Sequence, residues 1–69
     1  MTEKELLYLE DAIGHEAILT NVCQDIVDNL EDEDLVSFME DEIKIHKSNY
    51  KKLYNLMEAK KNEWWLINE

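Results

Sequence analysis

Apolar residues recur every three or four positions along two long stretches of the chain, and this spacing predicts two α-helices. The repeating positions are Leu6, Leu9, Ile13, Glu16, Thr20, Cys23, Val27 and Leu30 in the first stretch, and Leu35, Met39, Glu42, His46, Asn49, Leu53 and Leu56 in the second. Thr2 followed by Glu5 is the pattern of an N-terminal capping box. We expect one helix over about residues 3–30, a second over about residues 33–62, and a tail over 63–69.

The acidic segment Glu31–Asp34 predicts the bend between the two helices. Four acids are unfavourable at the negative C-terminal end of a helix and favourable at the positive N-terminal end of the next one. Folding about this bend brings the two repeating patterns into register, with Glu16 opposite His46 and Thr20 opposite Glu42. The chain is therefore predicted to be a single all-α domain, residues 1–69, folded as an antiparallel helical hairpin.

Each helix carries more apolar residues than one hairpin can bury. The flanking apolar positions are Ala12, Leu19 and Ile26 on the first helix and Val36, Ile43, Tyr50 and Met57 on the second. Pairing two hairpins around a two-fold axis would cover this surplus. We expect a homodimer or higher homo-oligomer that forms a four-helix bundle.

Composition limits the fold class, the partners and the location that we expect. One Gly and no Pro in 69 residues leave few turn signals for a β-sheet. Seventeen acids against seven Lys give a net charge of −10, which disfavours nucleic acid and anionic membranes as partners. The single Cys allows no intrachain disulfide, and the polar N-terminus lacks a signal-peptide pattern. We expect a soluble, cytoplasmic protein.

Three polar residues interrupt the apolar pattern at one level of the predicted hairpin. Glu16 lies on the apolar face of the first helix, and Glu42 and His46 lie on that of the second. Carboxylate and imidazole groups are common ligands of iron, manganese and zinc, and helical bundles build such sites from inward-facing side chains. Glu16, Glu42 and His46 are therefore candidate ligands, and His15 beside Glu16 is a further candidate.

A structural interpretation of the same residues stays open. Buried polar groups can form a hydrogen-bonded layer that fixes the register of packed helices without binding metal. Thr20, Asn49 and Tyr50 are next to the candidate ligands along the pattern. They could donate hydrogen bonds to ligands, and Thr20 and Asn49 could equally set the helix register.

Two segments carry a family resemblance. The first is Leu6-Leu7-Tyr8-Leu9-Glu10-Asp11-Ala12-Ile13-Gly14-His15-Glu16, and the second is Asp41-Glu42-Ile43-Lys44-Ile45-His46. Together they resemble the ferritin-like superfamily, in particular short rubrerythrin-type and spore-coat proteins of spore-forming bacteria. The resemblance implies a ferritin-like four-helix bundle, a carboxylate-bridged iron site with redox or storage chemistry, and a spore-associated location. The family's ligand motif is Glu-x-x-His, whereas Ile43 stands three residues before His46 in this chain.

Trp64 and Trp65 are the remaining unusual feature. Two adjacent indoles cannot both lie on one side of a helix, so we expect Trp64 to cover the open end of the bundle and Trp65 to contact a protein partner. No phosphate-binding loop, zinc-protease helix or nucleophilic triad occurs in the sequence, which disfavours catalysis by side chains alone. The leading expectation is a ferritin-like metal-binding protein, and the alternative is a non-enzymatic structural or interaction module.

Overall fold

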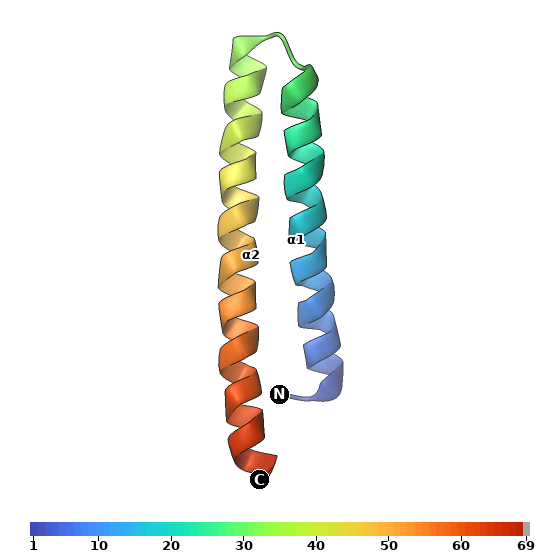
Figure 1. The fold of residues 1–69 in the computed structure, drawn as a ribbon, viewed down its shortest axis with the longest axis vertical. Helices are drawn as coiled ribbons and strands as arrows, with labels where there is room; N and C mark the ends of the chain where they lie inside the picture. The colour runs from blue at the N-terminus through green and yellow to red at the C-terminus, as the bar shows by residue number, and fades with distance from the viewer. Residues whose placement is uncertain (69) are drawn as a thin grey trace.

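The computed structural model describes the backbone of residues 1–68 and the side chains of residues 1–62, and it shows two antiparallel α-helices (Figure 1). Helix α1 spans Glu3–Asn29 and helix α2 spans Glu33–Asn68, joined by the short segment 30–32. The described residues contain no strand. The prediction of an all-α helical hairpin is confirmed.

Local side chains define where each helix begins. The Thr2 hydroxyl accepts a hydrogen bond from the Glu5 backbone N–H at 3.1 Å, and the Thr2 N–H donates to the Glu5 carboxylate at 2.9 Å. The bond from the Thr2 backbone, helped by the Thr2 side chain, lowers the pKa of Glu5. Asp32 caps α2, since its carboxylate accepts from the backbone N–H groups of Asp34 at 2.9 Å and Leu35 at 3.1 Å.

The second helix is longer than the sequence pattern predicts. We expected it to end near Asn62, but α2 continues to Asn68. The segment after Asn62 contains neither Gly nor Pro, so no residue there interrupts the backbone hydrogen bonds of the helix. The side chains of Trp64 and Trp65, with the partner role predicted for them, lie outside the described residues.

The buried side chains lie between the two helices. Ile13 and Cys23 on α1 are buried as the spacing predicts. On α2 the expected face is partly wrong: Met39, His46 and Leu53 are half-buried as expected, but Ile43 and Met57 are the buried residues, while Leu35 and Leu56 are about half exposed. The expected face would have placed Glu42 and Asn49 at its centre, and burying unpaired polar groups there is costly. A smaller rotation of α2, which keeps His46 facing α1, leaves both half-buried and buries Ile43 and Met57 instead.

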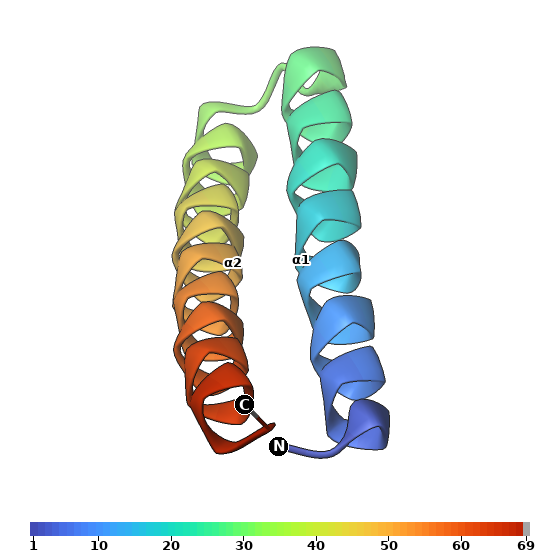
Figure 2. The same cartoon turned by 60° about the horizontal axis from the view of Figure 1, so that its bottom comes forward.

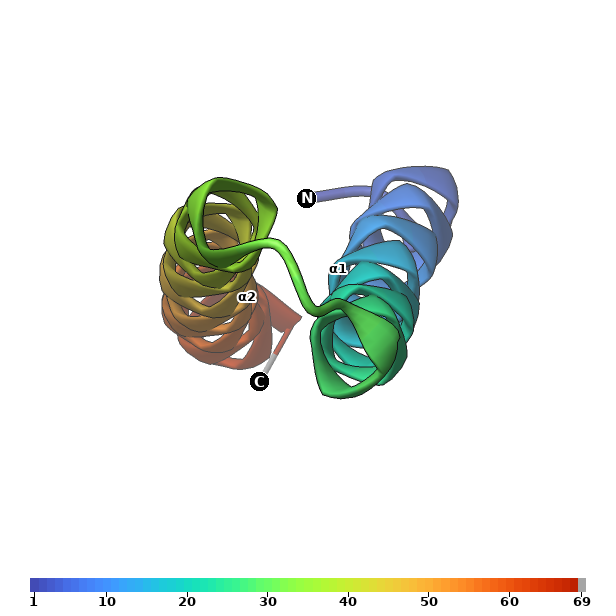
Figure 3. The same ribbon diagram turned by 90° about the horizontal axis from the view of Figure 1, so that it is seen from above.

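The hairpin is long and thin. Its principal extents are 55 × 15 × 12 Å, and its radius of gyration is 16.0 Å, against about 11 Å for a compact domain of this length. The tilted view shows α1 and α2 running side by side over their length (Figure 2). Viewed along the long axis they form a single layer, with no further described element covering either side (Figure 3). Across the described residues, neither helix offers an apolar stretch that could cross a membrane.

Gly14 makes α1 less stable than Ala at the same position would. It lies within α1, and a Cβ added there would meet nothing within 4 Å. Because Gly costs a helix interior about 1 kcal/mol relative to Ala, Gly14→Ala is expected to raise the free energy of unfolding by roughly that amount. Urea unfolding followed by circular dichroism measures it. An unchanged or lowered midpoint would show that the outer surface of α1 is covered at Gly14.

Candidate functional site

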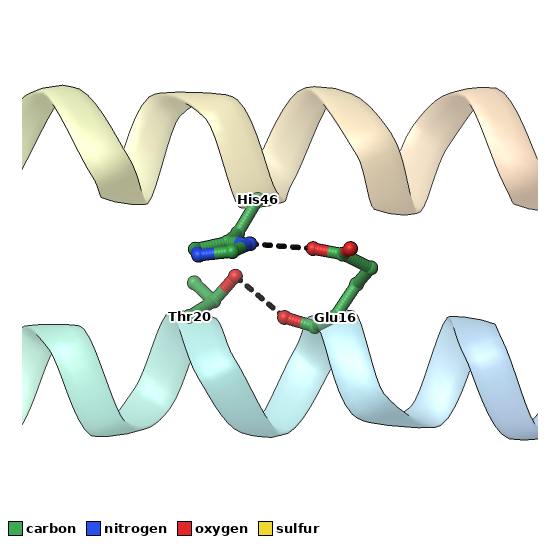
Figure 4. Close-up of polar contacts among 3 residues, drawn as sticks. All are labelled: Glu16, Thr20 and His46. Atoms are coloured by element: carbon green, nitrogen blue, oxygen red, sulfur yellow. Dashed lines mark hydrogen bonds and ion pairs between the residues drawn. The ribbon is translucent and has the colours of Figure 1, made fainter.

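Glu16 and His46 meet between the two helices at mid-length of the hairpin. The Nδ1 atom of His46 lies 2.6 Å from a carboxylate oxygen of Glu16, and each side chain is 19% exposed (Figure 4). Glu16 is the middle residue of α1, so this contact links the helices halfway along their paired length. The predicted register, with Glu16 opposite His46, is confirmed.

The chemistry of this contact fixes where one hydrogen atom lies. An ionised carboxylate can only accept hydrogen bonds, so Nδ1 of His46 carries the hydrogen when Glu16 is ionised. The other ring nitrogen, Nε2, has no hydrogen-bond partner among the described residues. If His46 is neutral, Nε2 presents a lone pair; if it is protonated, the two side chains form a half-buried ion pair. Both states join the helices through a charge-assisted bond.

Thr20 supports this level of the hairpin through its own helix. Its hydroxyl donates to the backbone carbonyl of Glu16 at 2.9 Å (Figure 4). Back-bonding from a Thr to the residue four positions earlier is common in helices. The hydroxyl therefore does not hydrogen-bond to the Glu16 carboxylate. Thr20 acts on the backbone next to the Glu16–His46 pair.

The remaining sequence-predicted residues are near this level but are not joined to the pair. Glu42 and Asn49 are half-buried, and His15 is exposed. None of the three makes a hydrogen bond or ion pair within the described part of the chain. Tyr50 instead stacks on Tyr54, with ring centroids 6.4 Å apart and an interplanar angle of 9°. Sequence reasoning missed this stack, although the four-residue spacing of the two tyrosines signals it.

The described part of the hairpin does not gather its metal-ligating side chains into one cluster. Among the described residues, no set of three His, Cys, Asp or Glu side chains lies close enough to hold one ion. One chain thus brings together two of the three predicted ligands, Glu16 and His46, and leaves Glu42 apart from them. Further ligands would have to come from a second chain or from movement of Glu42.

No family model, curated protein or solved structure matches this chain. The ferritin-like resemblance therefore stays a prediction drawn from the residues quoted above.

The Glu16–His46 pair is expected to behave as a coupled unit in stability measurements. Glu16→Leu alone or His46→Leu alone leaves one half-buried polar partner unsatisfied, which costs about 1–3 kcal/mol. The double variant removes both partners, and its stability is expected to return to within about 1 kcal/mol of the original. A double-mutant cycle in urea measures the coupling. Additive losses in the double variant would contradict a direct interaction.

Proposed function

We propose that this chain is a non-enzymatic helical assembly module that works by packing its exposed apolar surface against another helical protein surface. One observation carries the proposal. Only four hydrophobic side chains among the described residues are buried, whereas twelve large ones are between 40% and 60% exposed. Water-exposed apolar area on this scale is unusual for a protein that acts alone and is typical of an interaction surface.

The surface area of the hairpin supports the proposal. The single chain exposes 5518 Å², while a compact monomer of its mass exposes about 4,600 Å². A chain of this length also supplies a small core, and such chains commonly reach full stability through association. Packing against a partner would bury the surplus.

The Glu16–His46 pair has a structural part in this proposal. A polar contact within an otherwise apolar helix–helix interface is satisfied in only one alignment, since sliding either helix by one turn separates the two side chains. The pair thereby specifies the register in which the hairpin presents its exposed residues. A structural role in a coat or scaffold, which the family resemblance implies, is the biological setting that this proposal favours.

The proposal is tested by the dependence of stability on protein concentration. Folding that is coupled to association becomes more favourable as concentration rises. We expect the melting temperature, followed by circular dichroism from low micromolar to millimolar protein, to increase steadily, with the molecular mass from sedimentation rising in parallel. A cooperative melt independent of concentration, at a mass of 8.3 kDa throughout, would rule out self-assembly as the source of stability.

Metal binding is a second candidate, favoured by the meeting of Glu16 and His46 inside the hairpin. Two ligands of one tetrahedral ion lie about 3.4 Å apart, so these atoms, now at 2.6 Å, would need to separate by less than about 1 Å. The hydrogen on Nδ1 would have to leave, or Nε2 would have to serve as the ligand. With Glu42 as the third ligand and a second copy doubling the set, the site would suit iron, manganese or zinc. Its chemistry would be redox or storage, supplied by the metal.

The metal candidate has its own test. Glu42→Leu combined with His46→Leu is expected to abolish any rise in melting temperature caused by Fe(II), Mn(II) or Zn(II), whereas Glu40→Leu, an exposed Glu on the same helix, should leave that rise unchanged. Metal analysis of the purified protein gives the stoichiometry. If none of the three ions raises the melting temperature of the original protein, the metal candidate is wrong and the assembly proposal is unaffected.

A further inference from the structure

One long side of the hairpin is mostly apolar along its length. On α1 it consists of positions at three- and four-residue spacing, namely Tyr8, Ala12, His15, Leu19, Val22 and Ile26. On α2 the corresponding positions are Leu35, Phe38, Glu42, Ile45, Asn49 and Leu56. We call these two stripes the apolar face.

The two stripes lie on the same side of the hairpin. Each is displaced in the same rotational sense from the residues buried between the helices, and in antiparallel helices this places both stripes on one side. The groove at the open end shows it directly, since Tyr8 of α1 and Leu56 of α2 both line it. Thr20, Lys47 and Tyr50 line a different groove, on the opposite side.

Most of the exposed apolar area belongs to this face. Eight of the twelve exposed large hydrophobic residues lie on it, and Leu7, Ile18, Tyr50 and Tyr54 are the other four. At roughly 100 Å² each, eight half-exposed side chains supply about 800 Å² per copy, which is what one partner contributes to a standard protein interface. The face is therefore large enough to support a stable dimer.

Charge is distributed unevenly along the hairpin. Residues 16–46, which form the loop half, contain ten acids and one Lys, a net charge of −9. The other half contains the remaining seven acids and six Lys, a net charge of −1. Two copies placed with their loops together would bring both strongly negative halves into contact. Two copies placed head to tail would set each negative half beside the lysine-bearing half of the other.

Charged residues at the border of the apolar face match this arrangement. At the open end Lys4 lies over the Tyr8 ring, 5.8 Å from its centroid, and Lys52 is one turn from Leu56. At the loop end Asp34 and Asp41 each lie one turn from a residue of the face. Charges this close to an interface matter most, because screening at physiological salt weakens interactions beyond about 8 Å.

The Lys and Asp residues named above lie at matching distances from the Glu16–His46 level, measured along the long axis. Lys4 is twelve residues from Glu16 toward the open end, and Asp34 is twelve residues from His46 toward the loop. Lys52 and Asp41 are six and five residues from His46 in opposite directions. A two-fold axis at the Glu16–His46 level, perpendicular to the helices and in the plane of the apolar face, sets α1 against α1 and α2 against α2 of a second copy. It therefore brings Lys52 beside Asp41 of the second copy's α2, whereas Lys4 is level with its Asp34 only across the diagonal of the bundle.

We propose that the occupant of the apolar face is a second copy of this chain in head-to-tail orientation, related by a two-fold axis at the Glu16–His46 level. The proposal rests on the assembly function proposed above and names its partner. It places two Glu16–His46 pairs at the centre of a four-helix bundle. It also puts the loop of each copy at the open end of the other.

Zero-length cross-linking of the unmodified protein tests the orientation. A carbodiimide joins a Lys to a carboxylate only in direct contact, and Lys52 and Asp41 of one chain are separated by about 16 Å along α2. In a mixture of ¹⁴N- and ¹⁵N-labelled chains, we expect Lys52–Asp41 links between chains, in a species of twice the chain mass. Links between chains that join Lys52 to Asp11, which a parallel dimer would bring to the same level, with no Lys52–Asp41 link, would overturn the proposal.

A matched pair of variants tests the role of the border charges. Lys4→Gln with Lys52→Gln is expected to weaken dimerisation about tenfold and to reduce its dependence on salt, because the dimer loses its two Lys52–Asp41 pairs and the attraction of each Lys4 to the negative half of the other copy. Lys47→Gln with Lys51→Gln removes the same charge from outside the apolar face and should change the dissociation constant less than twofold. Equal effects of the two pairs would overturn the charge-directed orientation.

The two proposals fail in different ways. A trimer, a larger ring or a parallel dimer would overturn the head-to-tail dimer and leave the assembly function standing. A folded monomer whose melt does not change with concentration would overturn the head-to-tail dimer and remove self-association as support for the assembly function.

Discussion

Phe38→Gln combined with Ile45→Gln is expected to convert the associated protein into monomers at micromolar concentration. Both side chains lie on the apolar face of α2, and each is at least half exposed in the single chain. Burying the remaining half of such a side chain contributes about 1 kcal/mol or more, and a dimer contains four of them. The dissociation constant should therefore rise by roughly a thousandfold.

The control for this pair is Leu7→Gln with Ile18→Gln on α1. These residues are as exposed as Phe38, but helical spacing places them on the side of α1 that faces away from α2. The same loss of apolar area there should leave the dissociation constant within about threefold. Sedimentation equilibrium measures both pairs. A larger effect from Leu7 and Ile18 would move the contact surface to the outer side of α1.

Ile43→Ala is expected to destabilise the hairpin strongly at every protein concentration. Ile43 is 6% exposed and lies between the helices, so its truncation loses transfer free energy and leaves a cavity. Buried Ile-to-Ala changes cost about 2–5 kcal/mol, which for a domain of this size corresponds to a fall in melting temperature of more than about 10 °C. Urea unfolding gives the free energy, and thermal melts give the shift.

Ile18→Ala is the matched control for this substitution. It makes the same chemical change at a side chain that is 60% exposed and is expected to change stability by less than about 0.5 kcal/mol. Should the two variants lose similar amounts, Ile43 would not be enclosed between α1 and α2 in solution.

The sequence was sufficient to predict the helices, the bend and one long-range contact. The capping box at Thr2, the acids at 31–34 and the repeating apolar positions act locally, so their consequences can be inferred without a structure. The Glu16–His46 contact followed from register, because the short loop leaves the helices one compatible alignment. The helix bounds, the capping box and the buried positions of the N-terminal half were therefore predicted correctly.

The face of α2 that packs against α1 could not be predicted from spacing alone. Two neighbouring faces of α2 both repeat with helical spacing. Both are apolar at their ends, with Leu35 beside Val36 and Leu56 beside Met57, so periodicity does not show which of the two faces packs against α1. Glu42 and Asn49 decide the matter, since one rotation would bury them and the other leaves them at the edge. Whether Glu42 joins a metal site depends on a second chain, whose position one sequence does not specify.

The reactivity of Cys23 can measure how often the hairpin opens. Its thiol is the only one in the sequence, and it is buried between α1 and α2, where a thiol reagent can reach it only after the helices separate. The rate of its modification therefore reports how often the hairpin opens, without any introduced label. If the hairpin can open only after the associated protein dissociates, the modification rate should fall as the protein concentration rises. The modification of Cys23 would then report both the dissociation of the chains and the opening of the hairpin.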